Sequence, residues 1–518
     1  MNSLVLTLVL LAGADTRAPH PLTLDDALAR ALAKNYTIAI EREAYASAGQ
    51  RVRSEQGAYD VQLGLEAGYG RRSDPVNSLL SGAPAGAGAP AFRSRDFDAS
   101  LTQLLPRGGS ARVFAGATRE RTDGLFSLLS PAYASAFGVE LRQPLLRDRA
   151  IDPVRRRINV ARSEKDRSLA GLKRTIAETL TAVESAYWSL IAAQRDALVR
   201  AESLALAEQQ LRETRSRIEV GTLPETEEAQ PRAELERRRG ELLGAQERGA
   251  RAENALKALM LDEGDDPLWA ERLVPTDDAI AEPRAIDVAS ALEAALQLRP
   301  EIEQAKAGVS AREIELAAAR DQTKPRLDAY ASYARRGLAG SLNPDAAGFA
   351  GQPVVVPRDL AGGFGRSLGN LGDGVYPDLR LGLSFTIPLG NRTARSNVAI
   401  AQSSERQAAA DLQRLRQAIR VEVWNAVAGV ETTAERISAA RSAREAAEIQ
   451  LRSEQERFAV GMSTNFLVLT RQNQLARARL DEIEALSDHR KALVELQRAS
   501  GRLLQERGVV VAEGGKNS

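Results

Sequence analysis

The sequence contains no cysteine and only two histidines, His20 and His489. The lack of cysteine excludes disulfides, cysteine-ligated metal sites and lipid attachment to a cysteine side chain. Two histidines far apart in the chain argue against imidazole-based catalysis or a histidine-rich metal site, although carboxylates remain available. No set of nucleophile and base stands out either. We therefore expect a protein that is not an enzyme and that has no cofactor and no catalytic metal.

The chain also lacks an excess of charge of either sign, and it has few aromatic residues. The net charge is +1, so neither a nucleic acid nor an acidic substrate is implied. Aromatic residues make up 4% of the chain, and 14 of the 22 lie in the windows 57–143 and 325–390. Helical periodicity disappears in the same two windows. The chain thus alternates aromatic-poor helical segments with glycine-rich segments that carry the aromatic residues.

Long apolar runs are missing as well, so no membrane-spanning helix is expected. The short run Leu4–Ala12 is followed by Gly13 and Ala14, a pattern of small residues that favours a secretory signal peptide over residues 1–14. No lysine or arginine precedes this run. The alternative is therefore an ordinary N-terminal segment of a soluble protein.

What the chain does contain is a long helix rich in alanine, glutamate and arginine, ended by an elbow, and it occurs twice. The first copy is expected from about 154 to 220 with its elbow at Gly221, and the second from about 395 to 460 with its elbow at Gly461. A helix of about 65 residues spans roughly 100 Å. Such a length predicts a coiled coil, a helical repeat or a rod.

The plan around these helices is duplicated. The apolar pattern at 27–32 recurs at 291–296, an offset of 264 positions that also carries Tyr69 onto Tyr333. An offset held over such a distance indicates internal duplication. We predict a first structural repeat at 15–261 (helix, strands, long helix, elbow, return helix), an inter-repeat connection at 262–284, a second structural repeat at 285–508 and a polar tail at 509–518.

Strand patterns replace the helical period in both windows. Apolar residues alternate with polar or small residues at 61–69, 137–142, 327–333 and 379–387. The first repeat carries an additional expected hairpin, with strands at 97–105 and 113–118 on either side of the turn 106–109. Strands of about ten residues with one apolar face are typical of a transmembrane barrel, in which lipid-facing and lumen-facing positions alternate.

Two strand pairs cannot close a barrel alone. Either several chains contribute strands, or the strands are edge hairpins of a soluble protein. A signal peptide, strands of barrel length and no spanning helix together point to a bacterial outer membrane.

The order and duplication of these elements resemble the TolC-type outer-membrane efflux protein family. The resemblance rests on the openings at 22–32 and 286–296, the strand exits at 143–146 and 387–389, and the two elbows, and it covers nearly the whole chain. It implies an α+β membrane protein built from two structural repeats per chain. It also implies a homotrimer, in which one shared transmembrane β-barrel of twelve strands is continued by a long periplasmic α-helical coiled-coil barrel.

The same resemblance implies a function and partners. The protein would be a passive outer-membrane channel, the exit duct of a tripartite efflux pump or a type I secretion system, for small molecules or polypeptides. A periplasmic adaptor protein would dock at the elbows around Gly221 and Gly461, an inner-membrane transporter would supply the cargo, and outer-membrane lipid would surround the barrel. The alternative that remains open is a soluble coiled-coil scaffold protein.

The additional hairpin leaves the number of strands open. If 97–105 and 113–118 join the barrel, each chain contributes six strands and a trimer has eighteen. If they fold aside, the twelve strands implied by the resemblance remain. We predict twelve, because the second repeat lacks this hairpin.

The resemblance also implies an acidic residue six positions after each elbow glycine, at the periplasmic pore entrance. Glu227 holds this position in the first repeat, between Glu225 and Glu228, whereas Leu467 replaces it in the second. Three chains would ring the pore with carboxylates and favour cations. Alternatively, these glutamates only stabilise a helix N-terminus through its dipole.

Studied members of the family latch the closed entrance through a tyrosine three positions before the second elbow glycine and an arginine two positions after it. Phe458 and Ser463 occupy these positions here. The latch therefore cannot form in the same way in this chain.

Overall fold

The computed structural model describes residues 17–73, 75, 82–84, 86–262, 264, 266–278, 286–347, 353–460 and 462–511. The expected signal peptide at 1–14 and the elbow residue Gly461 lie outside these ranges, as do parts of the expected connection and tail. The chain divides into two compact units. Unit 1 comprises Met1–Ser47, Asp166–Ala307 and Ala409–Ser518, and unit 2 comprises Ala48–Lys165 and Gly308–Ala408.

Four helices contain the points at which the chain passes from one unit to the other: α2 (Tyr36–Gln56), α3 (Pro153–Glu219), α6 (Pro300–Asp321) and α8 (Arg392–Ala459). Helices α3 and α8 have 67 and 68 residues, so the two long helices expected from the sequence are confirmed. Proline is tolerated at the start of α3 because the first helical N–H has no partner within the helix. The Asp152 carboxylate caps this end by accepting hydrogen bonds from the N–H groups of Val154 and Arg155, both at 2.8 Å.

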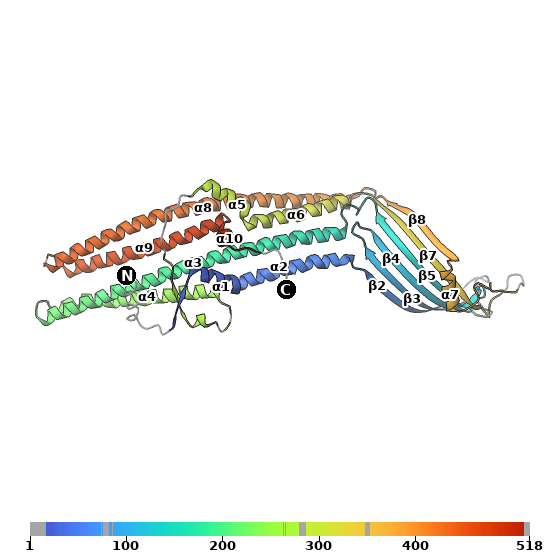
Figure 1. Cartoon of the computed structure of the whole chain (residues 1–518), viewed down its shortest axis with the longest axis horizontal. Helices are drawn as coiled ribbons and strands as arrows, with labels where there is room; N and C mark the ends of the chain where they lie inside the picture. The colour runs from blue at the N-terminus through green and yellow to red at the C-terminus, as the bar shows by residue number, and fades with distance from the viewer. Residues whose placement is uncertain are drawn as a thin grey trace. The chain divides into compact units, whose positions relative to one another are not determined.

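Among the described residues of unit 1, the regular structure is helical apart from one short pair of parallel strands, β1 (Pro19–Leu22) and β6 (Arg272–Pro275). Its other helices are α1 (Leu24–Lys34), α4 (Ala229–Met260), α5 (Val288–Leu298), α9 (Asn465–Ala499) and α10 (Leu503–Glu506), with 3-10 turns at η4 (Glu225–Glu228) and η5 (Pro267–Trp269). Both halves of the chain show the same order of a short helix, a second helix, strands, a long helix and a return helix (Figure 1).

Two hydrophobic clusters form the core of unit 1, and most of each comes from one half of the chain. The first includes Leu28, Leu180, Tyr187, Leu256 and Met260, and the second Ile302, Ile419, Val423, Val427 and Ala499. Tyr187 is fully buried on α3, and its hydroxyl donates to the main-chain oxygen of Leu22 at 3.0 Å and to the Asp277 carboxylate. Through these hydrogen bonds the buried phenol of Tyr187 connects the strand pair β1–β6 to the long helix α3.

Unit 2 contains one antiparallel sheet of six strands in the order β2-β3-β4-β5-β7-β8 (Figure 1). The strands are β2 (Gln62–Ser73), β3 (Ala91–Leu104), β4 (Ser110–Thr122), β5 (Leu129–Pro144), β7 (Arg326–Leu342) and β8 (Tyr376–Thr386). Strands β3 and β4 are the additional hairpin, and they stand between β2 and β5. The prediction that the hairpin folds aside is therefore wrong for this sheet.

The physical reason is the continuity of the apolar pattern across the hairpin. The cross-strand register aligns Leu63, Leu101, Val113, Val139, Tyr333 and Leu379 in one row across all six strands. Phe97 and Leu101 on β3 thus extend the apolar surface of β2. The neighbouring strands β2 and β4 pair with β3 along its length and provide partners for its backbone hydrogen-bonding groups. Comparing the two repeats could not reveal this, since only the first repeat has the hairpin.

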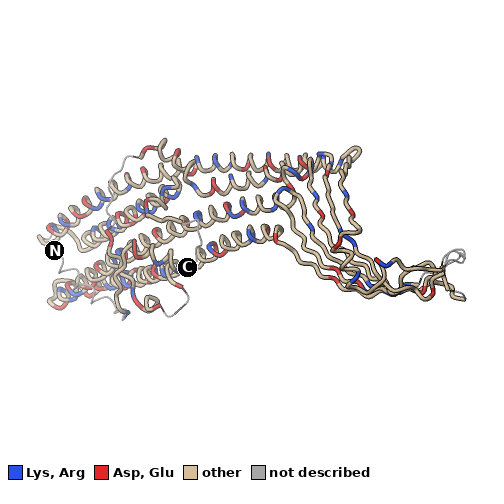
Figure 2. Tube along the Cα trace, turned by 45° about the vertical axis from the view of Figure 1, so that its right-hand side comes forward, with Lys and Arg blue, Asp and Glu red and all other residues tan. Residues whose placement is uncertain are grey.

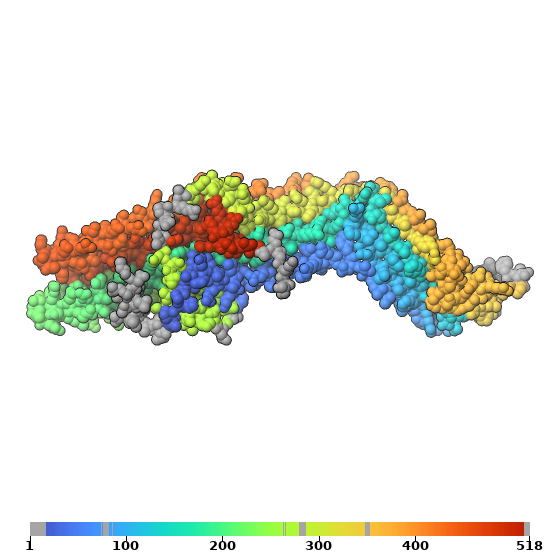
Figure 3. All heavy atoms as spheres, in the orientation of Figure 1, coloured from blue at the N-terminus to red at the C-terminus, as the bar shows by residue number. Residues whose placement is uncertain are grey.

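Because side chains alternate, the sheet has two chemically different faces. The apolar face is the one that carries the row just described. The polar face carries, among others, the aligned row Gln62, Thr102, Arg112, Glu140, Ser332 and Arg380. In Figure 3 the strands form one continuous surface, from light blue through cyan to orange.

A short helix, α7 (Phe364–Gly372), packs against β5 and β7 at the ends of these strands that are joined by loops. The Ser135 hydroxyl lies 2.9 Å from the Ser367 hydroxyl, and the Asn370 amide donates to the Leu338 main-chain oxygen at 2.8 Å. Gly337 permits this approach, since a Cβ there would lie 1.9 Å from the Ser367 main-chain oxygen.

None of the described helices is long and apolar enough to cross a membrane.

Candidate functional site at the elbows

The first elbow is a tight reversal between α3 and α4, and its glycine is required by the backbone. Gly221 has a φ of +76°, a left-handed conformation that a residue with a Cβ adopts only with strain. The N–H of Thr222 donates to the Arg217 main-chain oxygen at 2.9 Å, and the Thr222 hydroxyl donates to the same oxygen at 2.8 Å. The helix thus ends with its last carbonyl groups satisfied.

The three glutamates predicted at the pore entrance form the 3-10 turn η4 directly after this reversal. Glu225 and Glu227 are exposed to solvent. Glu228 is half-buried, and its carboxylate accepts hydrogen bonds from the guanidinium of Arg215 at 3.0 and 2.8 Å. The three carboxylates are therefore not equivalent, because Arg215 already compensates the charge of Glu228.

The second elbow has the same hydrogen-bond pattern but a different surface. The Met462 N–H donates to the Arg457 main-chain oxygen at 2.8 Å, as Thr222 does to Arg217. Gly461 itself lies outside the described residues, so its backbone conformation is not assigned. Thr464 caps α9, since its hydroxyl accepts a hydrogen bond from the Leu467 N–H at 3.4 Å.

Apolar side chains cover the tip of the second elbow. Val460, Met462 and Phe466 are 71%, 78% and 60% exposed, and Leu467 is 40% exposed. The first elbow has one comparable residue, Val220, beside its glutamates. One tip is thus acidic and the other apolar.

A cation–π contact joins the two elbow regions within unit 1. The guanidinium carbon of Arg217 lies 5.1 Å from the centre of the Phe458 ring. Phe458 is the residue that replaces the latch tyrosine expected from the resemblance, and Ser463, at the other latch position, donates a hydrogen bond to Glu454. Both side chains are therefore engaged within the chain.

The return helices are also linked, further from the tips. The Asn473 amide on α9 lies 3.5 Å from the Glu234 carboxylate on α4, and the Arg237 guanidinium is equally far from the Asn473 oxygen. Burial tends to raise the pKa of Glu234, but hydrogen bonds from Arg237 and Arg238 outweigh it and lower that pKa. Glu234 is therefore held as a carboxylate.

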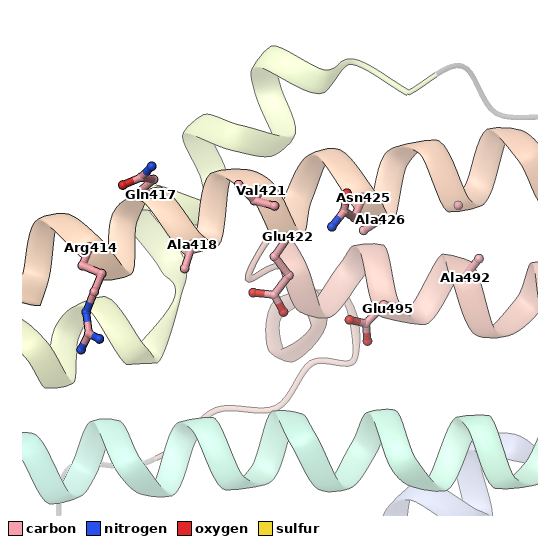
Figure 4. Close-up of a pocket in the computed structure, with 10 residues that line it drawn as sticks. Arg414, Gln417, Ala418, Val421, Glu422, Asn425, Ala426, Ala492 and Glu495 are labelled. Atoms are coloured by element: carbon pink, nitrogen blue, oxygen red, sulfur yellow. The ribbon is translucent and has the colours of Figure 1, made fainter.

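A second candidate site is an open groove of about 710 Å³ on α8 and α9. Figure 4 shows Glu422 and Glu495 projecting into it from the two helices. Both carboxylates are occupied, because Arg299 and Arg498 donate to Glu422 and Arg498 also donates to Glu495. In the part of the chain that the structure describes, no group of three or more histidine or acidic side chains is placed to hold a metal ion.

Sequence reasoning identified the elbows and their glutamates but missed the pairs Arg215–Glu228 and Arg217–Phe458. Arginines are so frequent on these helices that no local pattern marks Arg215 or Arg217. Which arginine meets which partner depends on how the helices pack, and only the structure provides that.

Comparisons with known proteins concern the family and the fold of the chain. Residues 291–502 match the model of a family described as outer membrane efflux protein. No curated protein matches the chain. Among solved structures, a membrane protein from Pseudomonas aeruginosa is 19% identical with a TM-score of 0.64, and the match covers 92% of this chain and 90% of that one.

Two further solved structures are outer membrane channels. The Campylobacter jejuni CmeC channel is 15% identical with a TM-score of 0.63, covering 93% of this chain and 86% of its own. The Neisseria gonorrhoeae MtrE channel, in its open state, is 17% identical with a TM-score of 0.61, covering 93% and 89%. At this identity the likeness concerns the fold.

The chain thus has the fold of outer-membrane channels over almost its whole length. Its second half carries the sequence pattern of the outer membrane efflux protein family. The resemblance to TolC-type outer-membrane efflux proteins is confirmed.

Proposed function

We propose that this protein is the outer-membrane exit duct of a tripartite efflux pump or a type I secretion system. Substrate would leave passively through a channel that crosses the outer membrane and extends into the periplasm. The single observation that carries the proposal beyond the family match is the apolar face of the six-stranded sheet. In a soluble scaffold, the alternative considered above, such a face would be exposed to water, which soluble proteins rarely allow.

The size of this face supports contact with lipid. Its large apolar side chains stand exposed on the strands of both repeats, among them Leu63, Leu65, Phe97, Leu141, Leu381 and Leu383. Soluble monomers rarely expose a contiguous apolar patch above a few hundred Å². The opposite face carries Arg112, Glu140 and Arg380, side chains suited to a water-filled lumen.

Within this proposal, three copies form one barrel. Strands β2 and β8 are the two edges of the sheet, with 12 and 11 residues, and an open edge is not tolerated in lipid. Since six alternating strands end antiparallel to the first, β8 of one copy can pair with β2 of the next. Three chains then give eighteen strands, about the number at which barrels enclose an aqueous channel.

The elbows are proposed as the periplasmic end of the duct. Glu225 and Glu227, with Glu228 beside them, would line the pore entrance, and the residues around Gly221 and Gly461 would receive the periplasmic adaptor. The apolar tip formed by Val460, Met462, Phe466 and Leu467 supports docking, because burial of such side chains stabilises an interface. An inner-membrane transporter would deliver the cargo through this assembly.

A deletion strain tests the function. We expect the wild-type gene to restore export, measured as resistance to toxic compounds or as secretion of a polypeptide cargo. The protein should sediment with outer membranes and need detergent for extraction. A chain that stays in the soluble fraction without detergent would contradict the proposal and favour the scaffold.

A further inference from the structure

Arginines gather at one end of the apolar face, where the strands are joined by loops. The register places Arg71, Arg93 and Arg121 directly opposite one another on β2, β3 and β4. In the adjacent row of the same face, Arg95 lies opposite Arg119. Figure 2 shows basic residues at this end of the strands. Five arginines thus occupy two neighbouring rows of a face whose other rows carry mainly apolar side chains.

The sheet provides these arginines with no acidic partner on their own face. The carboxylates of the same strands lie at positions of opposite parity and so belong to the polar face: Glu66, Asp96, Asp98 and Glu120. Among the described residues, none forms an ion pair with any of the five arginines. Directly opposed like charges destabilise a sheet, so this arrangement calls for an anion from outside the chain.

Two observations on the second row strengthen this argument. Arg119 is half-buried, and its Nε atom is buried without a hydrogen-bond partner among the described residues. Tyrosines flank the pair in the same row: Tyr69 opposes Arg95, and Tyr133 opposes Arg119, whose guanidinium lies 5.7 Å from the ring centre. Tyrosines mark the level at which a membrane-facing surface meets the headgroups.

We propose that these arginines bind the phosphate groups of anionic lipid headgroups at the membrane surface on the loop side of the sheet. Arginine presents a planar fork of donors that matches phosphate oxygens. Opposed side chains on neighbouring strands start about 5 Å apart, so one phosphate can receive donors from two arginines. The lipid tails would then lie along the apolar rows, at Phe97, Leu65 and Leu101. The proposal rests on the proposed function, because it requires this face to meet lipid.

The test is native mass spectrometry of the purified assembly in neutral detergent, with equal amounts of phosphatidylglycerol and phosphatidylcholine added. We expect the wild type to retain phosphatidylglycerol preferentially. The variant R95Q/R119Q should lose this preference about thirtyfold, given the usual contribution of two surface cations to lipid binding. The variant R95K/R119K keeps the charge and should keep most of the preference.

The matched control is R336Q/R380Q, which also removes two arginines from the sheet but on the polar face, where both pair with Asp378. We expect it to leave the lipid preference unchanged. A third arm adds inorganic phosphate, which should not displace the lipid at equal concentration.

Several results would overturn the proposal: equal retention of both lipids by the wild type, no change in R95Q/R119Q, an equal loss in the control, or displacement by inorganic phosphate. Membrane sedimentation of each variant is measured beside them. A chain that enters the membrane without lipid preference contradicts only this inference, whereas one that never enters the membrane contradicts the proposed function.

Discussion

At the scale of single residues, the structure separates side chains that the sequence presents as equal. Glu225, Glu227 and Glu228 form one acidic run in the sequence, yet Arg215 engages only Glu228. The positions of all three could be predicted from the elbow, because local sequence determines a turn. The partner of Glu228 could not, because Arg215 is one of many arginines on α3 and its choice depends on helix packing.

The first prediction follows from this difference. The double variant E225Q/E227Q should remove most of the cation preference of the reconstituted channel, measured as the reversal potential across a planar bilayer under a salt gradient. The fold should persist, since exposed charges at a helix end contribute only about 0.3–1 kcal/mol each.

E228Q is the matched comparison, because it makes the same change on the same turn where Arg215 already compensates the charge. We expect a smaller shift of the reversal potential from it. An unchanged reversal potential in E225Q/E227Q would mean that the glutamates act only on the helix end and that selectivity lies elsewhere in the channel.

The second prediction concerns His489, which is buried on α9 with its Nδ1 atom 3.1 Å from the Thr433 hydroxyl. Burial, and then the positive charge of Arg490, lower the pKa of His489 below its ordinary value of 6.5. The unfolded chain therefore binds a proton more readily than the folded one. The contribution of neutral His489 to the stability of the folded protein should be fully present above pH 6.5. It should be lost as the pH drops through 6.5 toward the lower pKa of His489 in the folded state.

The variant H489Q keeps a hydrogen-bonding side chain but cannot titrate. Thermal unfolding of wild type and variant, followed from neutral to mildly acidic pH, should show a smaller loss of Tm in the variant. Parallel curves for the two proteins would show that His489 is not the group responsible.

At the scale of elements, the regular segments follow from the sequence more fully than their partners do. The long helices were predicted within a few residues of α3 and α8, because a helical period and the absence of internal proline act locally. The strands of the hairpin were recognised too, but their place between β2 and β5 was not. Strand order depends on contacts distant in sequence, and the repeat comparison offered no counterpart for β3 and β4.

The third prediction belongs to the first elbow. Gly221 has a positive φ and open space around it, so G221V creates no steric overlap with other residues but strains the backbone by about 1–3 kcal/mol. We expect export to be lost while the trimer still assembles, as judged by complementation and by gel mobility.

Gly240, in the interior of α4, provides the control. It also has open space around it, but its φ is not in the left-handed range, so G240A should preserve export and favour the helix by about 1 kcal/mol. Normal export in G221V would count against a role of this elbow in docking.

At the scale of the whole molecule, the proposed barrel makes the fourth prediction. Because the natural chain has no cysteine, any introduced pair is the only pair that can form a disulfide. With L65C on β2, one of L379C, L381C, L383C or F385C on β8 should give an oxidised cross-link between chains. Apolar-face residues must pair with apolar-face residues for the two faces to continue around the ring.

Gly382 and Ser384 on β8 point to the other face and are the controls, since G382C and S384C have the wrong parity for L65C. Within one chain, L65C with A99C and A115C with F137C should cross-link, because these residues are opposite in the register. Cross-links between β2 and β5 of one chain would show that the hairpin lies outside the barrel and that the trimer has twelve strands.

The two edge strands of the sheet also determine how mutations at these edges would behave genetically and how assembly could be inhibited. A subunit with one damaged edge still offers the other, so it enters a ring that it cannot complete. In a cell that makes both forms, the proposed ring of three chains predicts that the yield of intact channels falls with the cube of the wild-type fraction. Edge mutations should therefore be dominant over the normal gene, and a peptide that imitates β8 should block assembly from the membrane side.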